Sequence, residues 1–148
     1  MRGHLDRAGH LGHLCMDPDG PPGICGTPGA FEGMVSNATL EHGSGGRFQH
    51  TRDLVEAYRD GDGQATRLWR RTVWCLACGI VSIINAIDPE RLVLGGGIAA
   101  AGAALFDPLY ENLTHLEWRP GGTQVRIEPA QLGHRAGAIG AVRFAADQ

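Results

Sequence analysis

The feature that most constrains the fold is a long apolar segment with helical periodicity that stops at a proline. Through residues 64–86, apolar side chains recur at the three- and four-residue spacing of one wide helix face. Asp88-Pro89 ends the segment, because the residue before a proline avoids helical backbone angles. Its longest apolar stretch, residues 73–87, is interrupted by polar residues and is shorter than the roughly 20 residues that cross a bilayer. The sequence therefore predicts a buried helix and no membrane span.

The pattern changes after this helix, and the change indicates an α/β layer. Short apolar runs alternate with glycine turns and helical segments, which is typical of parallel strands joined by helices. The elements predicted after the proline are strand 91–94, glycine turn 95–97, helix 99–118 with a kink at Pro108, strand 124–129 and helix 137–146. The predicted fold class is α/β, with a small, mostly parallel sheet packed by helices.

The first 50 residues form a different region, rich in Gly, Pro and His. Loops and turns are expected there, followed by a short helix over residues 30–36. A second helix is expected over residues 53–59, with Thr51 as its N-cap. A chain of 148 residues is expected to form one domain. We divide it into a loop-rich region, 1–50, and a helical α/β region, 51–148.

Composition argues against several classes of function. All 13 basic residues are Arg, 16 residues are acidic, and the formal charge is −3. No basic block or stripe is present, so nucleic acid is not an expected partner. The N-terminal sequence MRGHLDRAGH contains no apolar stretch of signal-peptide length. We therefore expect a cytoplasmic protein whose four cysteines are reduced thiols.

The triple glycine is the first candidate for binding chemistry. Gly95, Gly97 and Ala100 fit a relaxed G-x-G-x-x-[GA] pattern between a strand and a helix, where backbone can approach a phosphate. A dinucleotide site also requires an acid about 20 residues later, at the end of the next strand. Glu117 precedes that strand and Glu128 lies too far along it. A structural turn, a nucleotide contact and a dinucleotide site all remain open, the last being the least favoured.

A second candidate is the histidine- and cysteine-containing loop near the N-terminus. His10 and His13 are followed by Cys15 and Cys25, and these are residue types that zinc prefers. Their spacing matches none of the common zinc-finger patterns. A polar loop with solvated histidines is the simpler interpretation.

The C-x-x-C of Cys75 and Cys78 favours a core role over redox chemistry. It lies inside the long apolar helix, whereas redox motifs of this type lie at a helix start, where the thiolate is stabilised. Trp69 and Trp74 lie on the same helix and are interpreted as core or interface anchors.

Three segments, in order, resemble the ROK family of repressors, open-reading-frame proteins and sugar kinases. They are AGHLGHLCMDPDGPPGICGTPGAFE at 8–32, DPERLVLGGGIAAAGAALFDPL starting at Asp88, and LGHRAGAIGAVRFA at 132–145. The resemblance spans nearly the whole chain. It implies the C-terminal lobe of an actin-like (ribonuclease H-like) sugar kinase fold.

The resemblance also implies roles for particular residues. His13 corresponds to a histidine that contacts the sugar and ligates a structural zinc, and Glu32 to a glutamate that binds sugar hydroxyls. His10 stands where the family has a further sugar-binding glutamate. On the nucleotide side the implied residues are Gly95, Gly96 and Gly97, in the turn near the adenine, and Gly137 and Gly140, at the start of the last helix. The implied ligands are a hexose or related sugar and ATP with Mg²⁺.

Departures from the family pattern limit these expectations. Of three zinc cysteines only Cys25 remains, because Gly23 and Ala30 occupy the other two positions. Two ligands cannot close a tetrahedral structural site, so zinc is predicted to be absent. The family's D-x-G-G-T and G-T-G phosphate loops and its N-D catalytic aspartate do not occur in this sequence. We expect residues 1–148 alone to be inactive as a kinase.

Three hypotheses follow. The first is the sugar- and nucleotide-binding half of a glucokinase-like ROK kinase, with a homodimer as the expected assembly. The second is the sensor half of a sugar-responsive transcriptional regulator. The third is an unrelated nucleotide-binding α/β module that uses Gly95–Gly97.

Overall fold

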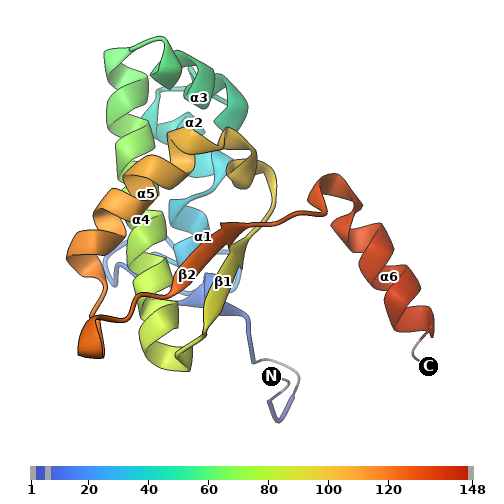
Figure 1. Ribbon diagram of the computed structural model, residues 1–148. Helices are drawn as coiled ribbons and strands as arrows, with labels where there is room; N and C mark the ends of the chain where they lie inside the picture. Colours follow the sequence, from blue (N-terminus) through green and yellow to red (C-terminus); the bar gives the residue numbers. More distant parts are fainter. Residues whose placement is uncertain (1–2, 6–7, 147–148) are drawn as a thin grey trace.

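The computed structural model describes residues 3–5 and 8–146 and shows helices packed on one face of a small sheet (Figure 1). Four short 3-10 turns, η1 to η4, connect the larger elements. In chain order the helices and strands are α1 (Phe31–Met34), α2 (Asn37–Gly43), α3 (Thr51–Arg59), α4 (Gly63–Ile87), β1 (Arg91–Leu94), α5 (Ala103–Leu116), β2 (Arg126–Pro129) and α6 (Ala136–Ala146). The chain is thus α/β, as its sequence predicts.

Helix α4 is the centre of the domain and confirms the predicted buried helix. It begins at an N-cap, Asp62, whose carboxylate accepts a hydrogen bond from the backbone N–H of Ala65 at 2.8 Å. It ends at Asp88, which adopts left-handed backbone angles immediately before Pro89. By length and hydropathy this helix would also suit a membrane span, but the core helices of water-soluble domains meet the same criteria.

The core lies where α3 and α5 pack against α4. Trp69 is fully buried, and its indole N–H donates to the carbonyl oxygen of Ala104 at 2.7 Å. Leu105 and Leu109 of α5 are fully buried in the same cluster. Because Trp69 combines a large apolar surface with a satisfied polar group, it fixes how α4 and α5 pack.

The two strands pair in parallel, with Leu92 opposite Ile127 and Val93 opposite Glu128. Ile127 is buried in the core formed by α4 and α5, and Leu92 packs against it. Val93, on the alternate side of β1, is 55% exposed. The sheet therefore buries one face, and α5 is the connection between its parallel strands.

Two predictions about elements need correction, and one helix was missed. Thr51 is not the N-cap of α3 but its first residue, and its backbone N–H donates to the Asn37 side-chain oxygen at 3.1 Å. The predicted helix 99–118 begins only at Ala103, because Gly97–Ala101 form a 3-10 turn and Gly102 has a φ of 58°. Helix α2 was not predicted at all.

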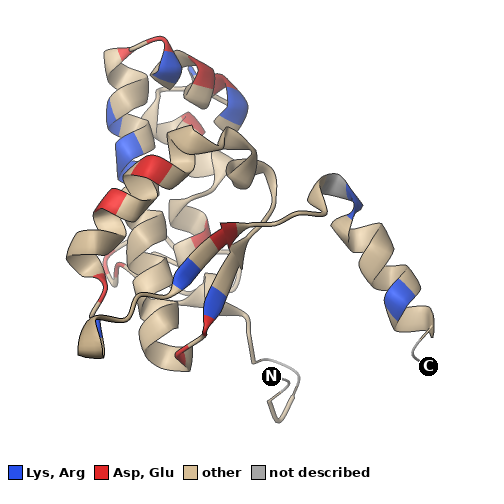
Figure 2. Cartoon of the chain, in the orientation of Figure 1, with Lys and Arg blue, Asp and Glu red and all other residues tan. Residues whose placement is uncertain are grey.

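Helix α6 extends away from the rest of the domain (Figure 1). All of its described residues are exposed, including Val142 at 72% and Phe144 at 66%. Acidic and basic residues are interspersed over α3 and the two strands, whereas α4 carries only arginines and the neighbouring α5 only acidic residues (Figure 2).

Candidate functional site

The loop before α1 is folded by backbone hydrogen bonds between its two ends. The N–H of Met16 donates to the Gly29 carbonyl oxygen, and the N–H of Phe31 donates to that of Leu14, both at 2.9 Å. A second antiparallel bridge joins Pro22 to Pro28. These contacts hold the 3-10 turn Leu11–His13 against the start of α1.

This folding brings the three predicted sugar-binding residues together. The Nδ1 atom of His13 lies 3.5 Å from Oε1 of Glu32, which is in the first turn of α1. The ring of His10 stacks on the ring of His13, with centroids 5.9 Å apart. The result is a cluster of one carboxylate and two imidazoles, suited to hydrogen bonding with a polyol.

Contact with the core positions this cluster. The ring of Phe31 packs directly on Gly79 of α4, so closely that a methyl group on Gly79 would overlap it. Phe31 precedes Glu32 in α1, so the glycine sets the position of the carboxylate. Sequence reasoning assigned Gly79 no role, because a helical glycine has no distinctive pattern.

The same loop lacks the donors that a tetrahedral zinc requires. Cys25 Sγ lies 3.4 Å from His13 Nε2, so the two remaining zinc-ligand positions are adjacent. Gly23 and Ala30, which occupy the other two zinc-ligand positions, are also adjacent. A Cβ added to Gly23 would lie 2.8 Å from the Cβ of Ala30. The described residues contain no group of three or more His, Cys, Asp or Glu side chains able to hold a metal. The residues present therefore do not fit the family's zinc.

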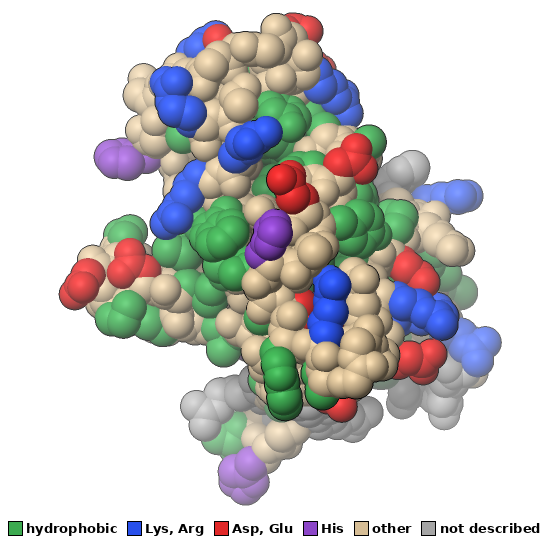
Figure 3. Space-filling model, turned by 60° about the vertical axis from the view of Figure 1, so that its left-hand side comes forward, with side chains coloured by type: hydrophobic (Ala, Val, Ile, Leu, Met, Phe, Trp, Pro, Cys, Tyr) green, Lys and Arg blue, Asp and Glu red, His purple; other side chains and the backbone are tan. Residues whose placement is uncertain are grey.

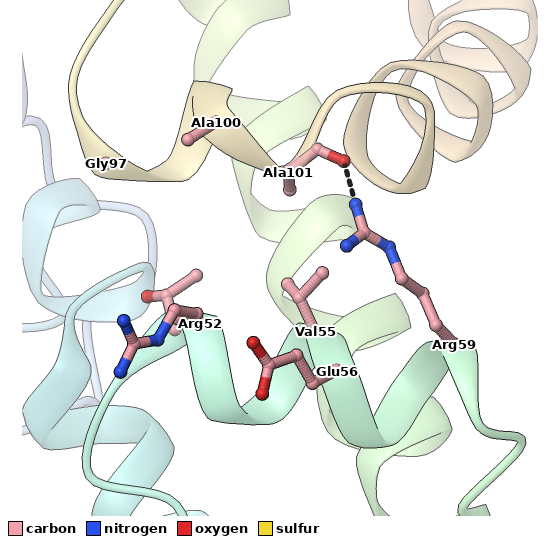
Figure 4. Close-up of a pocket in the computed structure, with 8 residues that line it drawn as sticks. Arg52, Val55, Glu56, Arg59, Gly97, Ala100 and Ala101 are labelled. Atoms are coloured by element: carbon pink, nitrogen blue, oxygen red, sulfur yellow. Dashed lines mark hydrogen bonds between the residues drawn. The ribbon is translucent and has the colours of Figure 1, made fainter.

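The glycine turn borders a cavity of about 460 Å³ (Figure 4). Gly97 and the backbone of residues 100–101 form one wall, and the facing side of α3 forms the other. The Arg59 guanidinium donates to the Ala101 carbonyl oxygen at 2.8 Å and so ties α3 to the turn. Glu56 is exposed at the cavity, and none of the hydrogen bonds or ion pairs found among the described residues involves its carboxylate. A cavity of this size suits a small-molecule ligand.

A second cavity of about 560 Å³ lies at the C-terminal ends of β1 and β2. Gly95, Gly96 and Gly97 line it, together with residues 129–130, Gly133 and Ala136. The last-helix glycines, Gly137 and Gly140, lie further along the exposed helix α6 and are not among its lining residues. The structure thus groups the first three predicted nucleotide residues, while the role of the last two stays a prediction.

Sequence reasoning missed the α3 side of the first cavity. Arg52, Glu56 and Arg59 line it at helical spacing, but each resembles a solvated surface charge in the sequence. The spacing alone would have placed them on one face of the helix. Only the packing of α3 against the glycine turn shows that this face borders a cavity.

The polar cluster and the glycine turn thus lie on one chain of the α/β class. The chain belongs to the ROK family, whose model matches residues 1–148. It is 31% identical over 142 residues to the N-acetylmannosamine kinase of Haemophilus influenzae strain PittGG, covering 95% of this chain and 46% of that protein. The chain spans about half the length of the curated relatives it matches.

Two solved ROK structures resemble the whole chain. The ROK hexokinase of Thermus thermophilus superposes with a TM-score of 0.84 at 31% identity, covering 100% of this chain and 52% of that one. A ROK glucokinase from Streptomyces griseus, solved in complex with glucose and AMPPNP, gives a TM-score of 0.77 at 27% identity, covering 100% of this chain and 54% of that one. The fold described here matches about half of a ROK kinase.

Proposed function

We propose that residues 1–148 are the sugar- and nucleotide-binding half of an ATP-dependent ROK sugar kinase of the glucokinase type. The observation that carries the proposal is the pairing of Glu32 with His13 at 3.5 Å, on a chain similar to sugar kinases over its whole length. A hexose or a related sugar such as N-acetylmannosamine is the substrate class. The relative from S. griseus was solved with glucose, which supports this class.

In this proposal the polar cluster holds the sugar. The Glu32 carboxylate accepts hydrogen bonds from adjacent sugar hydroxyls, because an ionised carboxylate offers two acceptor oxygens. His13, next to it, adds a further contact, and His10 stands where the family has a second glutamate. A neutral imidazole can donate through one nitrogen and accept through the other, so His10 would recognise a different hydroxyl pattern from a carboxylate.

ATP would occupy the region of the glycine turn. Gly95–Gly97 offer backbone without side chains. The adjoining 460 Å³ cavity is lined by apolar side chains, among them Val55, and by charged ones, among them Glu56, whose carboxylate has no described partner. A purine fits between such walls, and the carboxylate can accept from ribose hydroxyls. ATP with Mg²⁺ supplies the phosphoryl group. The neighbour solved with AMPPNP supports a nucleotide as a ligand of this family.

Phosphoryl transfer by these residues alone is not expected. Transfer requires a positioned base and groups that bind the phosphates and the metal. The family's phosphate loops and catalytic aspartate do not occur in residues 1–148. The chain's own residues would bind and orient the two substrates, and the remaining groups would come from the other half of a ROK fold.

Binding and transfer should be measured separately. Calorimetric titration of the 148-residue chain with glucose, N-acetylmannosamine and ADP tests the two binding sites, and coupled kinase assays test transfer. We expect sugar binding that falls at least about tenfold in Glu32→Gln, because a charge-assisted hydrogen bond is lost. Glu41→Gln, on the exposed side of α2, is the matched control and should bind like the wild type. Turnover by the chain alone, or sugar binding that Glu32→Gln leaves unchanged, would refute the proposal.

We further propose a cytoplasmic homodimer. Trp74 is 39% exposed on the outer side of α4, and Arg70 and Glu111 border a depression of about 230 Å³ beside it. Apolar side chains reach the surface among charged ones in this part of the molecule (Figure 3). A two-fold contact could pair the arginine of one copy with the glutamate of the other. Light scattering of the wild type and Trp74→Ala tests the assembly.

The alternative functions have less support. A dinucleotide site needs a helix that begins at the glycine turn, but α5 begins only at Ala103, after the 3-10 turn. The sensor half of a sugar-responsive regulator would share the sugar cluster and would lack kinase activity even when joined to its other half. Kinase activity of such a joined protein would therefore exclude the regulator.

A further inference from the structure

The loop that lacks the zinc donors still holds His13 in a defined orientation, and this requires another explanation. The ring lies between two polar groups. Glu32 Oε1 is 3.5 Å from Nδ1, and Cys25 Sγ is 3.4 Å from Nε2. Nδ1 is buried and makes no hydrogen bond among the described residues, and its ion-pair contact there is with the Glu32 carboxylate. The two contacts together constrain the tautomer of the ring.

The chemistry of the neighbours decides which nitrogen carries the proton. An ionised carboxylate only accepts hydrogen bonds, so Nδ1 is favourably placed beside Glu32 only when it bears hydrogen. In the neutral imidazole, Nε2 then holds the lone pair and needs a donor. The thiol of Cys25 is the group in contact with Nε2, and S–H is a donor.

We propose that Cys25 is a positioning residue for His13, with its thiol hydrogen donated to the lone pair of the imidazole Nε2 atom. The thiol locks the ring in the Nδ1–H tautomer, and the Nδ1–H then holds the Glu32 carboxylate in position for the sugar. The proposal rests on the proposed sugar-binding role of this cluster. It makes the loop independent of metal, since the bridges Cys15–Ala30 and Pro22–Pro28 fix the backbone.

Three variants of the full 148-residue chain test this role. Cys25→Ala removes the donor, and Cys25→Ser replaces it with a hydroxyl. Cys15→Ala is the matched control, because Cys15 is an exposed thiol of the same loop without a described side-chain contact to His13. Nitrogen-15 NMR of the imidazole, in alkaline buffer where a free imidazole is neutral, reports the tautomer directly.

We expect His13 to be held in the Nδ1–H form in the wild type, in Cys15→Ala and in Cys25→Ser, and to become a tautomer mixture in Cys25→Ala. Calorimetry with glucose and N-acetylmannosamine should show binding weakened about three- to tenfold in Cys25→Ala and restored in Cys25→Ser. Chelator should change neither measurement. If Cys25 only stabilised the loop, Cys25→Ser would not restore the Nδ1–H tautomer of His13.

The two measurements separate the two proposals. A tautomer change in Cys25→Ala without any sugar binding by the wild type would refute the proposed function and leave the Cys25–His13 contact standing. Sugar binding with the same tautomer and affinity in Cys25→Ala would refute the role of Cys25 alone. One equivalent of zinc bound to the purified chain, found by elemental analysis, would also overturn it.

Discussion

The helix pair α4–α5 and the loop that carries His13 are stabilised in opposite ways. In the helix pair, Trp69, Val73 and Leu105 are fully buried, and side-chain packing holds the elements together. In the loop, residues 8–30, only Gly29 and Ala30 are buried, and backbone bridges maintain the fold. Substitutions that disturb side-chain packing in the core should therefore lower the free energy of unfolding. Substitutions of polar side chains in the loop should change it little.

The largest effect is expected at the centre of the core. Trp69→Ala leaves a large cavity and removes the donor to the Ala104 carbonyl oxygen. Substitutions of this kind cost about 3–5 kcal/mol of unfolding free energy, a large part of the 5–15 kcal/mol typical of a domain. Urea unfolding followed by circular dichroism measures the loss. Trp118→Ala, outside the core and 74% exposed, should cost under about 1 kcal/mol. Equal losses in the two variants would contradict the assignment of the core.

The second substitution tests the contact between the two regions. Gly79→Ala places a methyl group against the Phe31 ring, which must move, and overpacking of this kind costs about 1–3 kcal/mol. Because Glu32 follows Phe31 in α1, sugar binding should fall together with stability. Gly33→Ala is the control, since an added Cβ there meets nothing within 4 Å and alanine favours a helix. Loss of stability with intact sugar affinity would show that the loop is not positioned through this contact.

The comparison also explains how far the sequence could predict the structure. The long helix and both strands were predicted closely, because apolar periodicity is a local pattern that packing reinforces. Helix α2 was missed although Ser36 caps it by accepting from the Thr39 N–H, a signal the sequence contained. The late start of α5 depends on the backbone angles of Gly102, which sequence does not specify. The cavity beside Gly97 depends on tertiary packing of α3, so no local pattern could reveal Glu56.

The third prediction concerns Glu32, whose carboxylate lies beside the loop that carries His13. Glu32→Gln should change the unfolding free energy by less than about 0.5 kcal/mol, because the carboxylate is partly exposed and its partner is 3.5 Å away. Sugar affinity should nevertheless fall at least about tenfold. Unfolding by urea and calorimetry with glucose, on the same sample, give both values. A fall in stability as large as that of Gly79→Ala would mean that the loop is folded by its side chains and would remove the contrast with the core.

The smallest effect is expected at the N-terminus of α4, where the core helix meets solvent. The Arg47 side chain, followed by the hydrogen bond from the Ala65 N–H, lowers the pKa of Asp62 below its ordinary value of 3.8. A lowered folded-state pKa means that the ionised carboxylate stabilises the fold above the unfolded-state pKa, and that this contribution disappears as pH falls through the folded-state pKa. Asp62→Asn keeps an N-cap acceptor and removes the charge.

Thermal unfolding as a function of pH measures this charge contribution. At neutral pH the Tm of Asp62→Asn should lie about one or two degrees below that of the wild type, because the ion pair with Arg47 is exposed. The difference should close as the pH falls below about 4, where carboxylates protonate. Arg47→Gln should remove most of the pH dependence by removing its main cause. A gap between wild type and Asp62→Asn that stays constant down to strong acid would mean that the cap geometry, and not the charge, stabilises the first turn of the core helix.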